Sequence, residues 1–174
     1  MNNDNSIYSL VALDIDGTMI GDDRIVKPEL ISAIDRVQSQ GAVVSISTGR
    51  TLRPALRISE EAGVLGPVIC FQGAMTFDQI SKTTIRHVRL DEAITRQAIT
   101  SLTSIVPEVM MFLGDDVWVE KRSEWTDGYG ERMGLAIRDT DSLLAMADSE
   151  PTAIVGGGEP KVVGPFVEKL SDLL

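Results

Sequence analysis

Short apolar runs alternate with amphipathic stretches through the first half of the chain. Three of the runs have the length and composition of buried strands: residues 10–13, 42–46 and 68–71. Between them, apolar residues recur at helical spacing. Pro28 is typical of a helix start, and Gly41 and Gly63 are typical of helix ends. Strand, helix, strand, helix and strand with short connections predict a parallel sheet with right-handed crossovers.

The pattern changes after residue 74, where turn residues become more frequent. The expected elements follow in this order: a hairpin of residues 75–77 and 85–88, a helix over 92–105 behind an Asp91 cap, a hairpin of 109–113 and 117–120, a strand pair of 152–155 and 161–163, and a helix from 165 to 174. Residues 123–134 are polar and aromatic and predict no element. We therefore expect two domains, residues 1–84 as a parallel α/β core and residues 85–174 as an α+β module.

The composition limits the classes of protein that these domains could form. Of the 174 residues, 43% are hydrophobic, which supports a buried core, and the net charge of −10 argues against a general nucleic-acid binder. No stretch approaches the ~20 apolar residues that a membrane-spanning helix needs. Cys70, the only cysteine, lies in an apolar run, which fits a reducing cytoplasm and excludes a disulfide within the chain.

Two aspartates follow directly on the first predicted strand. Because side chains alternate along a strand, Asp14 and Asp16 can project to the same side at its carboxyl end, where open parallel sheets place their sites. Two carboxylates held together repel unless one is protonated or both meet a cation. One carboxylate can attack a phosphoryl group, the other can move a proton, and Mg²⁺ suits clustered oxygen ligands. The alternative is a polar turn with solvated aspartates.

Polar and small residues also follow the second and third strands. Thr48 offers a hydroxyl and a backbone N–H to a phosphoryl oxygen, and Gly49 permits close approach of a ligand to the backbone. Arg50 can attract a phosphate, although arginines on a helix surface usually remain solvated. Gln72 and Gly73 form the corresponding turn after the third strand. Without the other segments, Thr48 and Gly49 are more typical of a simple strand-to-helix turn.

Together these segments resemble the haloacid dehalogenase superfamily of phosphatases. The resemblance rests on the sequences DIDGT at residues 14–18 and STGR at residues 47–50. The sequence QGA at residues 72–74, followed by a hairpin and a long helix, is similar to the Cof-type branch, whose members carry a large α/β cap after the third core strand. The resemblance implies a Rossmann-like parallel core with an inserted α+β cap.

The same resemblance implies roles for individual residues. Asp14 would be the nucleophile and a magnesium ligand. Asp16 would be the general acid and base and would give Mg²⁺ its backbone carbonyl. Thr48 would bind the phosphoryl group. The further residues expected to bind substrate or phosphate are Gly49, Arg50, Gln72 and Gly73.

The sequence departs from the family pattern in its second half. The family carries a later lysine and a Gly-Asp-x-x-x-Asp motif in the half of the core that returns after the cap. Neither is found here, because Gly114, Asp115 and Asp116 are interpreted as a hairpin turn and Lys161 as part of a strand pair. We therefore expect that the sequence stops within the cap and lacks the returning half of the core.

The resemblance favours a cytoplasmic, Mg²⁺-dependent phosphohydrolase that acts on a small phosphorylated metabolite, such as a sugar phosphate, through an aspartyl-phosphate intermediate. Two alternatives remain open: a catalytically incomplete fragment that binds phosphate or a partner chain, and one half of a split enzyme. Neither nucleic acid nor a membrane is an expected partner. The apolar edge expected at residues 10–13 leaves a homo-oligomer or a completing chain open as a partner.

Overall fold

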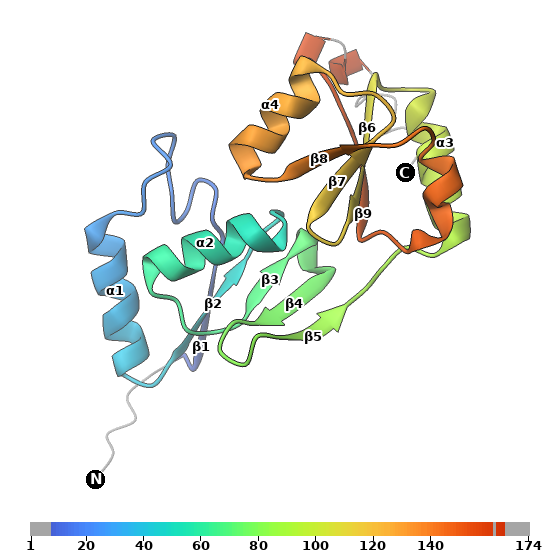
Figure 1. The fold of residues 1–174 in the computed structure, drawn as a ribbon. Coiled ribbons are helices and arrows are strands. Elements are labelled where there is room, and N and C mark those ends of the chain that lie inside the picture. The colour runs from blue at the N-terminus through green and yellow to red at the C-terminus, as the bar shows by residue number, and fades with distance from the viewer. Residues whose placement is uncertain (1–7, 162, 166–174) are drawn as a thin grey trace. The chain divides into compact units, whose positions relative to one another are not determined.

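The computed structural model describes residues 8–161 and 163–165, and the chain divides into two compact units (Figure 1). The first unit extends to Val88 and the second begins at Arg89. The expected boundary between residues 84 and 85 falls inside strand β5 (Thr83–His87), which pairs with the neighbouring strand on both sides of that boundary. For this reason the first unit extends a few residues further than expected.

The first unit contains a five-stranded sheet in the order β1-β2-β3-β4-β5. Its strands are β1 (Leu10–Leu13), β2 (Val43–Ser47), β3 (Val68–Cys70), β4 (Met75–Asp78) and β5. The pairs β1–β2 and β2–β3 are parallel, whereas β3–β4 and β4–β5 are antiparallel. The predicted parallel α/β core and the hairpin that follows it are confirmed.

Two helices cover one face of the parallel strands (Figure 1). Helix α1 (Pro28–Ser39) has Pro28 in its first turn, and helix α2 (Leu52–Ala62) ends at Gly63, whose φ of 69° is left-handed. The helix start at Pro28 and the helix end at Gly63 are therefore confirmed, and Gly41, with a φ of 92°, follows directly on the cap residue at the end of α1. The apolar side chains buried between these helices and the strands include Ile34, Val44, Ile46, Ala55 and Ile58.

Strand β1 lies at the edge of this sheet, as the apolar edge expected at residues 10–13 implied, and the prediction that residues 10–13 form a buried strand is wrong. Leu10 is 59% exposed and Val43 on the neighbouring strand is 45% exposed. The described helices of this unit cover only one face, because two right-handed crossovers in the same direction place both helices on the same side.

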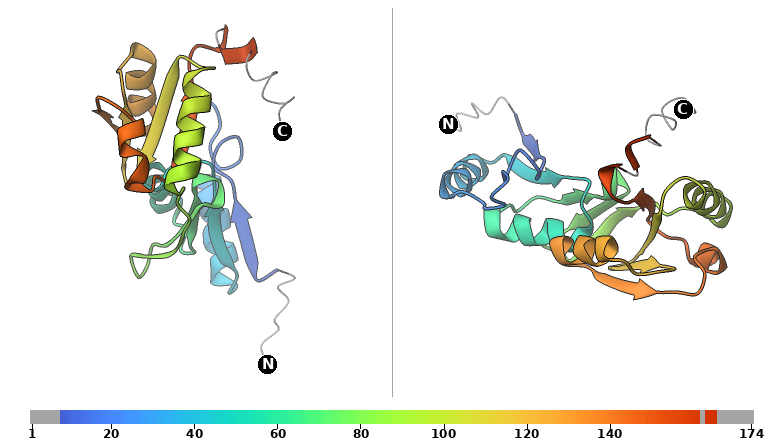
Figure 2. Two further views of the ribbon diagram at one scale, coloured as in Figure 1. Left: turned by 90° about the vertical axis from the view of Figure 1, so that its right-hand side faces the viewer. Right: turned by 90° about the horizontal axis from the view of Figure 1, so that it is seen from above.

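The second unit contains a four-stranded sheet in the order β8-β7-β6-β9. Its elements are α3 (Glu92–Thr103), β6 (Glu108–Leu113), β7 (Asp116–Val119), α4 (Glu124–Met133), β8 (Ala136–Asp139), a short 3₁₀ segment (Leu144–Ser149) and β9 (Ala153–Gly157). Helices α3 and α4 lie on opposite faces of this sheet (Figure 2). The adjacent glycines of β9 agree with this, since a Cβ at Gly156 would meet Leu102 of α3 and a Cβ at Gly157 would meet Trp125 of α4.

Several predictions for the second unit are confirmed and one is wrong. Asp91 caps α3 by accepting a hydrogen bond from the Ile94 N–H at 2.8 Å, and β6 and β7 form the expected hairpin. Lys161 and Val163 do not lie in the expected strand, because the Val163 N–H donates to the Glu159 carbonyl at 3.0 Å in a helical turn, and β9 pairs with β6 instead. Apart from Pro165, the predicted helix over residues 165–174 lies outside the described residues. Within the described part of the chain, no helix is both long and apolar enough to cross a membrane.

Candidate active site

Three loops of the first unit follow the carboxyl ends of β1, β2 and β3 and contain the predicted site residues. In the first loop Ile15 is fully buried, whereas Asp14 and Asp16 on either side of it are exposed. The Ile15 carbonyl accepts hydrogen bonds from the backbone N–H groups of Met19 and Ile20, each at 3.0 Å. The buried isoleucine and these hydrogen bonds hold the loop closed, so the two carboxylates are presented to solvent from one short segment.

The Arg50 guanidinium binds the Asp16 carboxylate through two hydrogen bonds. Nε donates to Oδ2 at 2.8 Å and Nη2 donates to Oδ1 at 2.6 Å. The Arg50 side chain is only 11% exposed, whereas that of Asp16 is 61% exposed. A bidentate guanidinium–carboxylate contact of this kind fixes both the position and the orientation of the carboxylate. The sequence predicted both residues for the site, but it did not predict that they pair.

The pair shifts both ionisation equilibria. The hydrogen bond from Arg50 is the largest effect and lowers the pKa of Asp16 below its ordinary value of 3.8. Desolvation, the next largest effect, opposes it, and the charges of Arg50 and Arg24 add smaller effects that also lower the pKa. The hydrogen bond to Asp16 raises the pKa of Arg50, to which the charge of Asp14 also contributes. Arg50 therefore binds Asp16 directly and also interacts electrostatically with Asp14.

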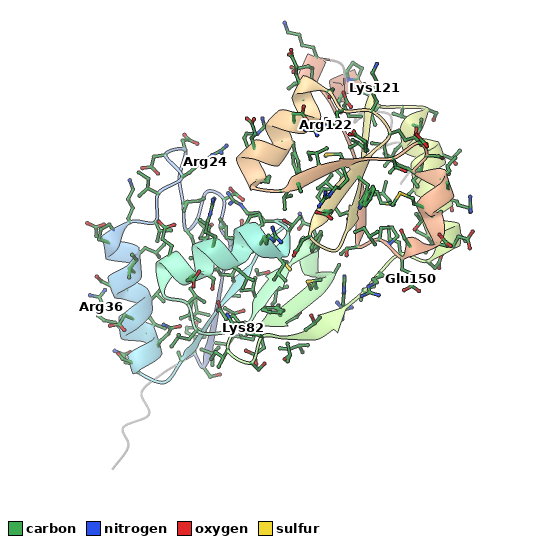
Figure 3. All side chains as sticks on the ribbon, viewed as in Figure 1. Arg24, Arg36, Lys82, Lys121, Arg122 and Glu150 are labelled. Atoms are coloured by element: carbon green, nitrogen blue, oxygen red, sulfur yellow. The ribbon has the colours of Figure 1, made fainter. Side chains whose placement is uncertain are left out.

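Arg24 is a member of this electrostatic group that the sequence analysis missed. It extends from the loop between β1 and α1 (Figure 3), with a left-handed φ of 55°. Its backbone N–H donates to the Gly21 carbonyl at 3.0 Å, which closes a tight turn. Nothing in a single sequence distinguishes such an arginine from any other loop arginine.

Thr48 is buried at the end of β2, with 5% of its surface exposed. Its backbone N–H donates to the Ile69 carbonyl at 2.9 Å, which continues the ladder to β3. The expectation that this N–H is available to a phosphoryl oxygen is therefore wrong. The hydroxyl oxygen accepts a hydrogen bond from the Arg50 backbone N–H at 3.2 Å.

The third loop approaches the second through Gln72. Its side-chain amide lies against the Cα of Gly49, so that a Cβ at Gly49 would be 3.0 Å from Gln72 Cδ. The Phe71 N–H donates to the Arg50 carbonyl at 2.9 Å, and the Gly73 carbonyl accepts Arg86 Nη1 at 2.7 Å. All seven predicted site residues thus occur in the three loops at the carboxyl ends of β1, β2 and β3.

Parallel α/β sheets bind their ligands at the carboxyl ends of the strands. A site there with carboxylates, a threonine hydroxyl and a guanidinium is suited to binding a phosphoryl group. The sequence pattern of the haloacid dehalogenase-like hydrolase family matches residues 11–155. The chain belongs to this family.

Individual relatives agree with this membership. YitU of Bacillus subtilis, named as a 5-amino-6-(5-phospho-D-ribitylamino)uracil phosphatase, is 29% identical over 117 residues, which cover 66% of this chain and 43% of YitU. A phosphoglycolate phosphatase of Methanopyrus kandleri is 40% identical over 67 residues, which cover 38% of this chain and 29% of that protein. The chain therefore spans less than half the length of these curated relatives.

Solved structures agree at the level of the fold. The crystal structure of a haloacid dehalogenase-like hydrolase from Bacteroides thetaiotaomicron matches with a TM-score of 0.78, over 94% of this chain and 63% of that chain. The sequence identity is 17%, so this likeness shows the fold alone.

Proposed function

We propose that the loops after β1, β2 and β3 form the phosphoryl-transfer site of a phosphohydrolase that acts on a small phosphorylated metabolite. The observation that carries this proposal is the convergence of Asp14, Asp16, Thr48 and Arg50 at one sheet edge, tied together by the bidentate Arg50–Asp16 contact. The curated relatives are named as phosphatases of small phosphorylated compounds, which supports this class of substrate.

In the first proposed step, a carboxylate oxygen of Asp14 attacks the phosphorus atom of a phosphate ester. A bond forms between Asp14 and phosphorus, the ester P–O bond breaks, and the leaving oxygen takes a proton from Asp16. In the second step, Asp16 removes a proton from water as the water oxygen attacks phosphorus. The bond to Asp14 then breaks, and inorganic phosphate is released.

The Arg50–Asp16 contact places a condition on this sequence of steps. Arg50 lowers the pKa of Asp16 below its ordinary value, so the contact disfavours the protonated form that the first step uses. Displacement of the guanidinium from Asp16 would remove this effect. The incoming phosphoryl group is itself an anion that prefers bidentate partners, and it gives Arg50 an alternative contact.

Magnesium fits the hard oxygen donors of the first loop. The Asp14 carboxylate and the Asp16 backbone carbonyl would hold it, together with water and substrate oxygens. Among the residues that the structure describes, no group of three or more His, Cys, Asp or Glu side chains could hold a metal ion. When bound, the metal would neutralise the charge on the phosphoryl oxygens.

The proposed nucleophile is tested by Asp14→Asn, which preserves the shape of the side chain and removes its charge. Hydrolysis of an aryl phosphate by the purified chain should be lost in this variant. Asp22→Asn is the matched control, because it removes an exposed carboxylate from the adjacent loop. Unchanged turnover in Asp14→Asn would refute the assignment.

The second candidate function is phosphate binding without turnover by this chain alone, or one half of an enzyme that another chain completes. The observation that favours it is the engagement of Asp16 by Arg50, together with the small number of acidic ligands in the described residues. A chain that binds inorganic phosphate but hydrolyses no ester would support this candidate. Recovery of turnover on addition of a second chain would identify the split form.

A further inference from the structure

Apolar side chains are exposed at the amino ends of β2 and β3, whereas the proposed phosphoryl site lies at the carboxyl ends. Val43 begins β2, Leu65 lies in the segment that leads into β3, and Ile80 lies in the turn between β4 and β5. Leu65 is 60% exposed and Ile80 is 72% exposed. Apolar side chains gathered in this way on a surface are typical of an interaction site.

Two recesses open beside these side chains. One, of about 260 Å³, borders Val43 and is lined largely by apolar groups, and the other, of about 350 Å³, extends to Glu60 and Lys82. Leu65 and Ile80 line both recesses and so lie between them. We refer to Val43, Glu60, Leu65, Ile80 and Lys82, together with the two recesses, as the basal patch.

The turn that carries Ile80 is held firmly. The Asp78 carboxylate accepts hydrogen bonds from the backbone N–H groups of Ile80 at 2.9 Å and of Ser81 at 3.3 Å. Gln79 fastens the turn to α2, because its amide oxygen accepts a hydrogen bond from the Ser59 hydroxyl at 2.9 Å. A backbone that is already ordered loses little conformational freedom when another surface covers it, which favours binding.

The backbone around Leu65 is also hydrogen-bonded within the protein. Gln38 of α1 donates to the Gly63 carbonyl and accepts the Leu65 N–H, each at 2.9 Å. Gln79 Nε2 donates to two further carbonyl groups of segment 63–66, at 2.9 and 2.5 Å. All four N–H groups of this segment and three of its carbonyl groups are thus bonded internally. Covering Leu65 would therefore leave few polar groups without partners, which keeps the cost of desolvation low.

The charges of the basal patch favour one kind of occupant. Glu60 and Lys82 line the same recess, and both side chains are exposed. In the part of the chain that the structure describes, no ion pair joins these two residues to each other. A partner of a single charge sign would meet one favourable and one unfavourable charge there. A second copy of the chain carries the same two charges, so a half-turn can place each lysine opposite a glutamate.

We propose that the basal patch is an interface between two copies of this chain related by a twofold axis. The same patch then serves on both copies, as in other isologous interfaces. Ile80 of each copy enters a recess of the other, and Lys82 of each copy faces Glu60 of the other. The interface lies away from the carboxyl ends of the strands, so it does not obstruct the proposed site. The inference does not depend on the proposed phosphohydrolase activity.

Sedimentation equilibrium and light scattering of the whole chain test the interface. The wild type should dimerise reversibly in the micromolar range, as expected of a small interface. Ile80→Ser should weaken dimerisation by about tenfold or more, because it removes the apolar side chain between the two recesses. Ile94→Ser is the matched control, since Ile94 is 50% exposed on α3 in the second unit. Labelling of the buried Cys70 by a thiol reagent should be equally slow in Ile80→Ser and in the wild type, which shows that the first unit stays folded.

Exchanging the charges separates a second copy from any other occupant. Glu60→Lys and Lys82→Glu each make both facing pairs alike in charge, so each variant alone should dimerise about tenfold more weakly at low ionic strength. An equimolar mixture of the two variants should recover dimers, because every facing pair is then opposite in charge. A fluorescent label on one variant identifies these as mixed dimers. Glu61→Lys, at the exposed neighbouring position, is the matched control and should dimerise like the wild type.

Four outcomes would overturn the inference. A wild type that stays monomeric at high concentration would leave the basal patch to a different partner. Dimers that withstand Ile80→Ser but are lost in Leu10→Ser would place the interface at the edge of β1. Loss of dimers in Ile80→Ser together with rapid labelling of Cys70 would show that Ile80 supports the fold and not an interface. A mixture of the two charge variants that yields no mixed dimer would exclude the twofold arrangement.

Discussion

The Arg50–Asp16 contact should be energetically coupled, and a double-mutant cycle measures this coupling. The variants are Arg50→Gln, Asp16→Asn and the double variant. The guanidinium is largely buried and makes two short hydrogen bonds, which favours a strong contact. The carboxylate is 61% exposed, so solvent screens the charge and limits the gain. We expect a coupling free energy of about 1 kcal/mol, between the values typical of exposed pairs and of charge-assisted hydrogen bonds.

The chain provides separate probes for its two units. Cys70, the only cysteine, is completely buried in β3, and burial raises the pKa of its thiol to about 12. A thiol reagent therefore labels it only when the first unit opens. Both tryptophans, Trp118 and Trp125, lie in the second unit, so their fluorescence shows whether a substitution in the first unit affects the second.

When reclosing is faster than labelling, the rate follows the free energy of opening, and 1 kcal/mol corresponds to about a fivefold change in rate. We expect the double variant to be labelled about fivefold more slowly than the sum of the single effects predicts. Arg50→Gln combined with Asp22→Asn is the control cycle and should be additive. Additivity within about twofold in the Arg50–Asp16 cycle would refute the coupling, since about 0.4 kcal/mol lies within the usual scatter of independent sites.

The coupling also has a defined dependence on pH. Because the pKa of Asp16 is lower in the folded chain than its ordinary value of 3.8, the contribution to stability is fully present above that value. It is lost as the pH falls through the lower, folded-state pKa. The cycle should therefore give its full coupling at pH 7 and a diminished one at about pH 3, where urea unfolding followed by circular dichroism replaces thiol labelling.

Three further predictions concern other parts of the molecule. Asp91→Ala removes the cap on the Ile94 N–H and should destabilise the second unit by about 1 kcal/mol, as seen in the urea transition of tryptophan fluorescence; no shift in midpoint would refute the cap. With so few protein ligands, Mg²⁺ should bind in the millimolar range, roughly 4 kcal/mol or less, and micromolar binding in calorimetry would contradict the ligand set. The exposed Leu10 and Val43 at the edge of the first sheet favour self-association, which sedimentation and light scattering test; a stable monomer at high concentration would count against it.

The sequence predicted the parallel core well because its signals are local. Each strand is an apolar run, and each crossover helix has a recognisable start or end. The polar residues of the motifs follow directly on the strands in the sequence, so their place at the strand ends could be predicted. The contact between Arg50 and Asp16 joins residues 34 positions apart, so no local pattern contains it. The left-handed backbone of Gln72, with a φ of 53°, is equally hidden, because sequence patterns associate left-handed conformations with glycine and asparagine.

The second unit shows where the patterns were weaker. Helix α4 contains Gly128 and Gly130, which lower helix propensity, and it was not predicted. Gly130 is required by packing, because a Cβ there would lie 2.8 Å from Ile137 Cγ1. The capping box of Ser123 and Thr126 was the available signal, but threonine is not the usual partner in that motif. Residues 156–158 lie between the two strands expected at 152–155 and 161–163, whereas Gly156 and Gly157 belong to β9, where α3 and α4 leave no space for a Cβ.

The central claim is that Asp14 forms a covalent bond to phosphorus, and chemical trapping tests it most directly. The chain is mixed with a phosphate monoester, quenched during turnover and treated with borohydride, which reduces an acyl phosphate to an alcohol. Mass spectrometry of the peptide that contains residues 14–18 should then show homoserine at position 14 in the wild type and not in Asp14→Asn. Ester hydrolysis that proceeds without homoserine at this position, or with the modification at another residue, would contradict the account.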